Sequence, residues 1–162
     1  MTDDPVNGTA ADGRPPAGRD PAGRLQPLIE VAFDRPDRSY AARDPLTVRY
    51  RVLGPGNVLR AIEQSVVWYT EGKGEEDLGV HHFTRVTDRK ALTAAGDEVT
   101  FATTLPASPL SYEGVIVKIR WCVRIRAFFP GGRDFVSEHV FEVGHVPPAQ
   151  PPRTPGRVET TA

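Results

Sequence analysis

Four basic side chains recur at even-numbered positions in the segment Ser111–Phe129. They are Lys118, Arg120, Arg124 and Arg126. A β-strand points alternate residues to the same side of a sheet, so all four are expected on one face. Such a row can donate charge-assisted hydrogen bonds to a phosphate-bearing or otherwise anionic ligand, such as a lipid headgroup or a phosphopeptide. The sequence therefore indicates these four residues as a candidate ligand or partner surface.

The alternative is that acidic residues of the same domain neutralise this row. Pro130-Gly131-Gly132 predicts a turn, and pairing of Phe129 with Arg133 across it sets the register of a hairpin with Phe135–Val143. The facing pairs are then Trp121 with Phe141, Arg124 with Glu138, and Arg120 with Glu142. Opposite charges that face each other across two strands stabilise a sheet modestly, and we favour this internal pairing.

The adjacent histidines His81 and His82 are candidate metal ligands, and several acidic residues precede them between Glu71 and Asp77. Adjacent residues of a strand point to opposite faces, however, so these two imidazoles are not expected to bind one tetrahedral metal ion. The acidic segment also lacks the regular spacing of oxygen ligands in a calcium loop. We therefore expect no metal site here.

The single cysteine, Cys122, lies among the basic residues, and neighbouring cations lower the pKa of a thiol, as in reactive cysteines. No catalytic pattern accompanies it. Ser111 and Ser137 lack a nucleophile-elbow context, and the chain contains no phosphate loop, dinucleotide fingerprint or zinc-protease motif. The sequence thus gives no support to an enzyme and no indication of a cofactor.

The elements that must position these residues are β-strands. In Ser111–Phe129 the odd positions from Val115 to Ala127 are apolar, which predicts the buried face of a strand about 50 Å long. Further strands are expected at Leu28–Phe33, Leu46–Leu53, Val58–Thr70, Gly79–Thr87, Val99–Leu105 and Phe135–Val143, with Asp88–Ala95 as a connection. One sheet cannot cover these apolar faces, so the predicted fold is an all-β, antiparallel two-sheet β-sandwich of about seven to eight strands.

The two ends of the chain differ in composition from the strands. Residues 1–24 are poor in large apolar residues and rich in proline and glycine. Residues 146–162 are also poor in large apolar residues and rich in proline. We therefore expect two disordered tails around a sandwich at residues 25–145.

The net charge of −1 over 162 residues provides no general attraction to nucleic acid. The first residues lack the apolar run of a secretory signal, and no stretch is long enough to span a membrane. We expect a cytoplasmic protein without a nucleic-acid partner, and peripheral membrane contact stays open.

Three stretches resemble the arrestin fold family, which includes a retromer subunit and bacterial sporulation-control proteins. The first is IEVAFDRPDRSYAARDPLTVRYRV, with Asp34, Tyr40, Asp44 and Leu46, and the second is VVWYTEGKG. The third is FATTLPASPLSYEGVIVKIRWCVRI, with Leu105, Pro106, Ser111, Tyr112, Gly114 and Trp121 at the family's positions.

This resemblance implies a single arrestin-like domain, an immunoglobulin-like β-sandwich of the type found as the N-terminal domain of arrestins. It also implies that the protein is an adaptor or scaffold without catalytic activity, which binds another protein. An arrestin contains two such sandwiches and this chain has room for one, so functions of the domain pair are not implied. A module that binds an anionic ligand through the basic row is the alternative function.

Overall fold

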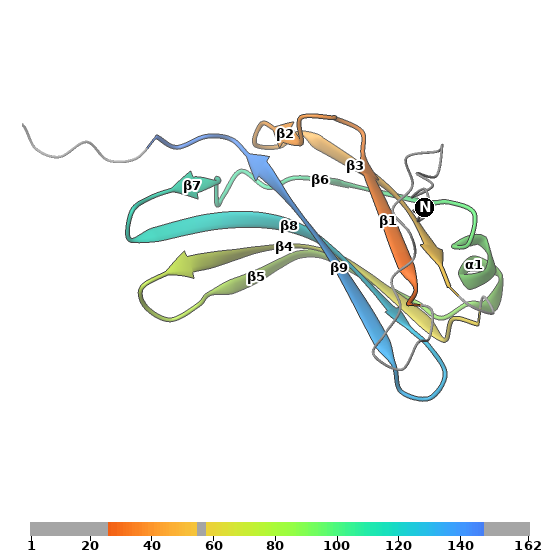
Figure 1. Cartoon of the computed structure of the whole chain (residues 1–162). Helices are drawn as coiled ribbons and strands as arrows, with labels where there is room; N and C mark the ends of the chain where they lie inside the picture. The colour runs from red at the N-terminus through yellow and green to blue at the C-terminus, as the bar shows by residue number, and fades with distance from the viewer. Residues whose placement is uncertain (1–25, 55–57, 148–162) are drawn as a thin grey trace, which may run out of the picture.

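The alternating segment around Trp121 forms strand β8, Val117–Phe128, inside a six-stranded sheet (Figure 1). The computed structural model describes residues 26–54 and 58–147. In this part of the chain the strand order of the sheet is β2-β9-β8-β4-β5, and β7 also pairs with β8. The other strands of the sheet are β2 (Ser39–Tyr40), β4 (Ala61–Gly72), β5 (Leu78–Val86), β7 (Tyr112–Glu113) and β9 (Asp134–Val143).

A second sheet of three strands covers one face of the first. Its strands, in spatial order, are β1 (Leu28–Phe33), β3 (Pro45–Leu53) and β6 (Val99–Thr104). The strand pairs are antiparallel except that of β2 with β9, which is parallel. The prediction of an all-β, two-sheet sandwich is therefore confirmed. The described residues contain nine strands, of which β2 and β7 have only two residues each.

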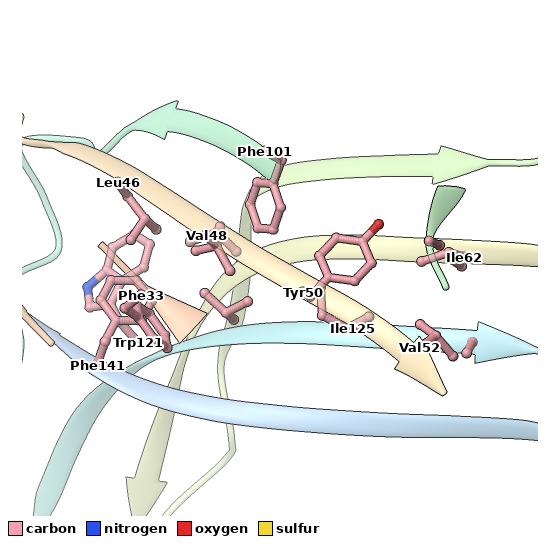
Figure 2. Packing of buried hydrophobic residues seen from close by; sticks show 14 of the residues in the cluster. Phe33, Leu46, Val48, Tyr50, Val52, Ile62, Phe101, Trp121, Ile125 and Phe141 are labelled. Carbon is pink, nitrogen blue, oxygen red and sulfur yellow. The ribbon is translucent and has the colours of Figure 1, made fainter. Parts of the chain in front are cut away.

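The core lies between the facing sides of the two sheets (Figure 2). It is built from alternate residues of β3 and β8, as the sequence pattern predicts: Leu46, Val48, Tyr50 and Val52 from β3, and Trp121, Val123, Ile125 and Ala127 from β8. The hydroxyl of Tyr50 donates a hydrogen bond to Oε1 of the buried Gln64, at 3.1 Å. The buried amide oxygen thus has a partner, which avoids the free-energy cost of an unsatisfied polar group.

Strand β8 begins later than the sequence pattern predicts. Val115 and Ile116 are exposed in a turn, because β7 folds back antiparallel against the start of β8. Gly114 permits this turn, since a Cβ at that position would lie 2.5 Å from the carbonyl oxygen of Val117. The strand of twelve residues therefore spans about 40 Å rather than 50 Å.

The connection expected at Asp88–Ala95 contains a short helix, α1 (Arg89–Ala94). Asp88 caps its N-terminus, and the side chain accepts a hydrogen bond from the N–H of Ala91 at 2.9 Å. Leu92 is buried in the core, and the carbonyl oxygen of Ala95 accepts a hydrogen bond from the N–H of Val52. A segment of six residues is too short to display helical periodicity in the sequence, and its tertiary contacts stabilise it.

The tails expected at residues 1–24 and 146–162 lie outside the described residues, except residues 146 and 147. Val146 forms a parallel bridge with Tyr112, and its N–H donates to the carbonyl oxygen of Ser111 at 3.3 Å. Backbone pairing thus continues one residue beyond His145, where the sandwich was expected to end. None of the helices in the described part of the chain is long and apolar enough to cross a membrane.

We predict that Trp121→Ala lowers the free energy of unfolding by about 3–5 kcal/mol, because a large side chain leaves a cavity in the core. Trp121 is fully buried, its ring centroid lies 6.1 Å from that of Phe141, and its Nε1–H donates to the carbonyl oxygen of Pro109 at 3.0 Å. Urea denaturation monitored by circular dichroism measures the change. Trp121→Phe keeps an aromatic ring and is expected to lose less. An alanine variant within about 1 kcal/mol of the wild type would contradict the packing described.

Candidate interaction surface on the six-stranded sheet

The candidate surface is the outer face of the six-stranded sheet, on the side away from the three-stranded sheet. The four predicted residues Lys118, Arg120, Arg124 and Arg126 lie on this face of β8, because they alternate with the buried Trp121, Val123 and Ile125. The structure therefore brings the basic row together on one face. Whether it binds a ligand depends on what else lies beside it.

Each residue of the basic row forms an ion pair with a carboxylate. Arg124 contacts Glu138 on β9 at 2.7 Å, which confirms the predicted pair. Lys118 contacts Glu113 of β7, and Arg126 contacts Asp134 of β9. The basic row is thus balanced within the domain along its whole length.

The expected pair of Arg120 with Glu142 is wrong. The paired register of β8 and β9 reaches only to Trp121 and Phe141, and Glu142 pairs instead with Ser39 of β2. Arg120 contacts Glu113 at 2.9 Å and Glu71 at 3.2 Å. These carboxylates come from β7 and β4, which the extrapolated hairpin register did not include. The hydrogen bond from Lys118, together with the positive charge of Arg120, holds the pKa of Glu113 below its usual value.

Cys122 shares the face of the basic row but is not accessible. It is 2% exposed, and its register neighbours are Val67 on β4 and Val140 on β9. Burial raises the pKa of the thiol to about 11, and this effect outweighs the nearby positive charge of Arg124. The expected environment of a reactive cysteine is therefore wrong, because side chains of the flanking strands cover the sulfur.

A shallow groove lies next to the basic row, toward the edge strand β5. Its apolar part consists of Val67, Leu78, Val80, Phe83 and Val136, and its polar part of Glu63, Ser65, Arg124 and Arg126. Leu78, Val80 and Phe83 are 57%, 58% and 55% exposed. Alternation in the sequence does not reveal this apolar row, because Phe83 has an odd number whereas Leu78 and Val80 have even numbers.

A β-bulge in β5 shifts the alternation of its side chains by one residue. Val66 pairs with His82 and Val67 with Val80, so His81 is an extra residue. Phe83 is thereby brought to the same outer face as Leu78 and Val80. The sequence signal for a bulge of this kind is weak, since no glycine or proline stands at the bulged position.

The bulge also turns both histidine rings toward the interior side of the sheet. His81 packs edge-on against Trp121, and its Nε2 lies 2.8 Å from the carbonyl oxygen of Thr104 on β6. His82 stacks on Phe101 of β6, with ring centroids 5.5 Å apart. The expectation that the two rings point to opposite faces is wrong, and instead both connect β5 to the other sheet. In residues 26–54 and 58–147 no three histidine, cysteine or acidic side chains are grouped as metal ligands.

Strand β5 is an edge of the six-stranded sheet. It pairs with β4 on one side, and within the described part of the chain no strand pairs with its other side. Unpaired N–H and C=O groups on that side can pair with another chain. The exposed apolar row and the unpaired edge therefore lie on the same strand.

We predict a coupling free energy of up to about 1 kcal/mol between Arg124 and Glu138, reduced by the partial exposure of both side chains. Arg124→Glu alone should destabilise the domain because two like charges then face each other, and Glu138→Arg added to it should restore most of the loss. Urea denaturation of the four proteins measures the cycle. The same cycle with Glu142 in place of Glu138 is the control, and equal coupling in both cycles would argue against a specific pair.

We also predict that iodoacetamide at pH 8 alkylates Cys122 at least about 100-fold more slowly in the folded protein than in urea. The raised pKa leaves little thiolate at this pH, and burial further restricts access. Mass spectrometry of timed samples gives both rates. Comparable rates in the two states would show that the sulfur is accessible.

Comparison with known proteins gives similarities of fold at low sequence identity. No protein-family model and no curated protein sequence matches the chain. One similar solved structure is Spo0M, a sporulation control protein from Bacillus subtilis, with 15% identity and a TM-score of 0.48 over 72% of this chain and 49% of that chain. Another is a superoxide reductase (neelaredoxin) from Ignicoccus hospitalis, with 18% identity and a TM-score of 0.42 over 73% and 80% of the two chains. The chain thus aligns with about half of Spo0M, which it resembles in its β-sandwich fold.

Proposed function

We propose that this protein is an adaptor or scaffold without catalytic activity, which binds an extended segment of a partner protein along β5. The observation that carries the proposal is the exposed row Leu78, Val80 and Phe83 on an unpaired edge strand. Such strands bind peptides by main-chain hydrogen bonds, while alternate side chains provide specificity.

The composition of β5 favours this mode of binding. Lysine, proline and inward-pointing charges commonly prevent edge strands from pairing. β5 contains no lysine and no proline, and its one arginine, Arg85, pairs with Glu63. The bulge at His81 interrupts the edge, so the longest regular stretch runs from His82 to Val86. We expect the partner segment to pair there and to extend over the groove.

The partner segment should have apolar residues at alternate positions and an acidic residue at one end. Apolar side chains fit the part of the groove formed by Val67, Val80 and Phe83. Arg85 lies at the end of this surface and pairs with Glu63 through Nη1. A guanidinium group has five N–H donors, so an acidic residue of the partner could bind the same side chain. A second copy of the chain carries apolar residues but no acidic residue on β5, so another protein fits better.

We also propose that the chain is a single arrestin-like domain, on the strength of its sequence resemblance. Three motif residues of the first stretch, Asp34, Tyr40 and Asp44, lie in one contact network. The hydroxyl of Tyr40 donates to Asp34 at 2.6 Å, and Asp44 accepts hydrogen bonds from Arg35 at 2.7 Å and from the N–H of Ala41 at 2.9 Å. The guanidinium carbon of Arg35 lies 4.7 Å from the centroid of the Tyr40 ring and so connects the two groups. The alternative function, an anionic-ligand module built on the whole basic row, has less support because each of its four residues has a carboxylate partner.

The test introduces charge on β5. Val80→Lys combined with Phe83→Lys should abolish labelling of the partner in a proximity-labelling experiment in the native cell, because lysine in a buried interface carries a desolvation cost. The matched control is Val115→Lys with Ile116→Lys, which adds the same charge at two exposed residues of the β7–β8 turn. Hydrogen exchange with the purified partner should then show protection of the amides of His82–Val86.

Two results would contradict the proposal. One is an unchanged set of labelled proteins for the Val80→Lys, Phe83→Lys variant. The other is a complex that dissociates on moderate addition of salt with no protection in β5, which would favour an electrostatic ligand site over strand pairing.

A further inference from the structure

We propose that a pocket at one end of the six-stranded sheet binds the phosphate group of a phosphate monoester. Its lining residues come from the start of β4, the end of β5 and the β8–β9 turn. The start of β4 and the β8–β9 turn lie at the same end of the sheet (Figure 1). The pocket is lined by four arginines and two aromatic rings: Arg60, Arg85, Arg126, Arg133, Phe128 and Phe129. Of the basic row, only Arg126 belongs to it. The inference goes beyond the proposed adaptor function, since it requires no partner strand on β5.

The positive charge of this pocket is only partly balanced. Arg85 pairs with Glu63, and Arg126 with Asp134. Arg60 and Arg133 form no ion pair and no side-chain hydrogen bond with the part of the chain that the structure describes. This distinguishes the pocket from the centre of the sheet, where each basic side chain of β8 has a carboxylate partner. Two positive charges therefore remain available to a ligand.

Phe128 positions the two paired arginines. The guanidinium carbons of Arg85 and Arg126 each lie 4.8 Å from the centroid of the Phe128 ring. Together with their carboxylates, these cation–π contacts restrict the two side chains before any ligand binds. Less conformational entropy is then lost on binding, which favours affinity.

The chemistry of the pocket fits a dianionic phosphate. Guanidinium groups donate paired hydrogen bonds to phosphate oxygens, and a monoester carries nearly two negative charges at neutral pH, which matches the two unpaired arginines. The pocket volume of about 490 Å³ lies within the range of roughly 300–1,000 Å³ found for small-molecule sites. The monoester can belong to a soluble metabolite or to a lipid headgroup, and the experiment separates these two sources.

The experiment titrates the ¹⁵N-labelled protein with glycerol 3-phosphate and follows amide chemical shifts. We expect saturable shifts at Ala61, Gly132 and Asp134, which line the pocket. Arg60→Gln combined with Arg133→Gln should weaken binding at least about tenfold, since charge-assisted hydrogen bonds are lost. Its unfolding midpoint should stay unchanged, because neither arginine is ion-paired within the described part of the chain.

The matched control is Arg43→Gln with Lys73→Gln, which removes the same charge from turns outside the pocket and should alter affinity by less than about twofold. A parallel arm measures binding to phosphatidylcholine vesicles with and without phosphatidic acid. Binding to the phosphatidic acid vesicles alone, lost in Arg60→Gln, Arg133→Gln and kept in the control, assigns the phosphate to a lipid. Equal weakening in both double variants, shifts that do not saturate, or no binding to either probe would overturn the proposal.

Discussion

The fold depends on the burial of the inner face of β8. Trp121, Val123 and Ile125 are completely buried, and the residues that cover them include Leu46 and Val48 of β3. Removal of apolar surface from water stabilises a fold by about 25 cal/mol for each Å². A sheet cannot cover its own face, so this row requires a second layer. The three-stranded sheet provides that layer, and the outer face of the six-stranded sheet stays accessible.

The outer face is chemically divided into three parts, and this division underlies the proposed functions. In its centre, ion pairs balance the basic side chains of β8, as in the pair of Arg124 with Glu138. Toward β5, apolar side chains such as Val80 lie beside an unpaired strand edge. At the end of the sheet, Arg60 and Arg133 have no carboxylate partner in the described part of the chain. The proposed partner strand and phosphate group would therefore bind adjacent parts of one surface, which share Arg85.

One extra residue in β5 connects the core with this surface. The bulge at His81 directs both histidine rings to the interior, where they contact Trp121 and Phe101. It also places Phe83 in line with Val80 on the outside. The same irregularity thus closes one side of the sandwich and completes the exposed apolar row, so that an inserted or deleted residue in β5 would affect stability and binding together.

The strands with regular alternation and the short-range pairs can be derived from the amino-acid sequence alone. The core positions of β3, the burial of Trp121 and the pair of Arg124 with Glu138 follow from a period of two residues and one turn, which are local properties. The partners of Arg120, the burial of Cys122 and the arginine pocket depend instead on tertiary contacts, because these features bring together strands that are distant in the chain. The bulge in β5 likewise depends on how two strands pair, and the identity of the bulged residue does not reveal it.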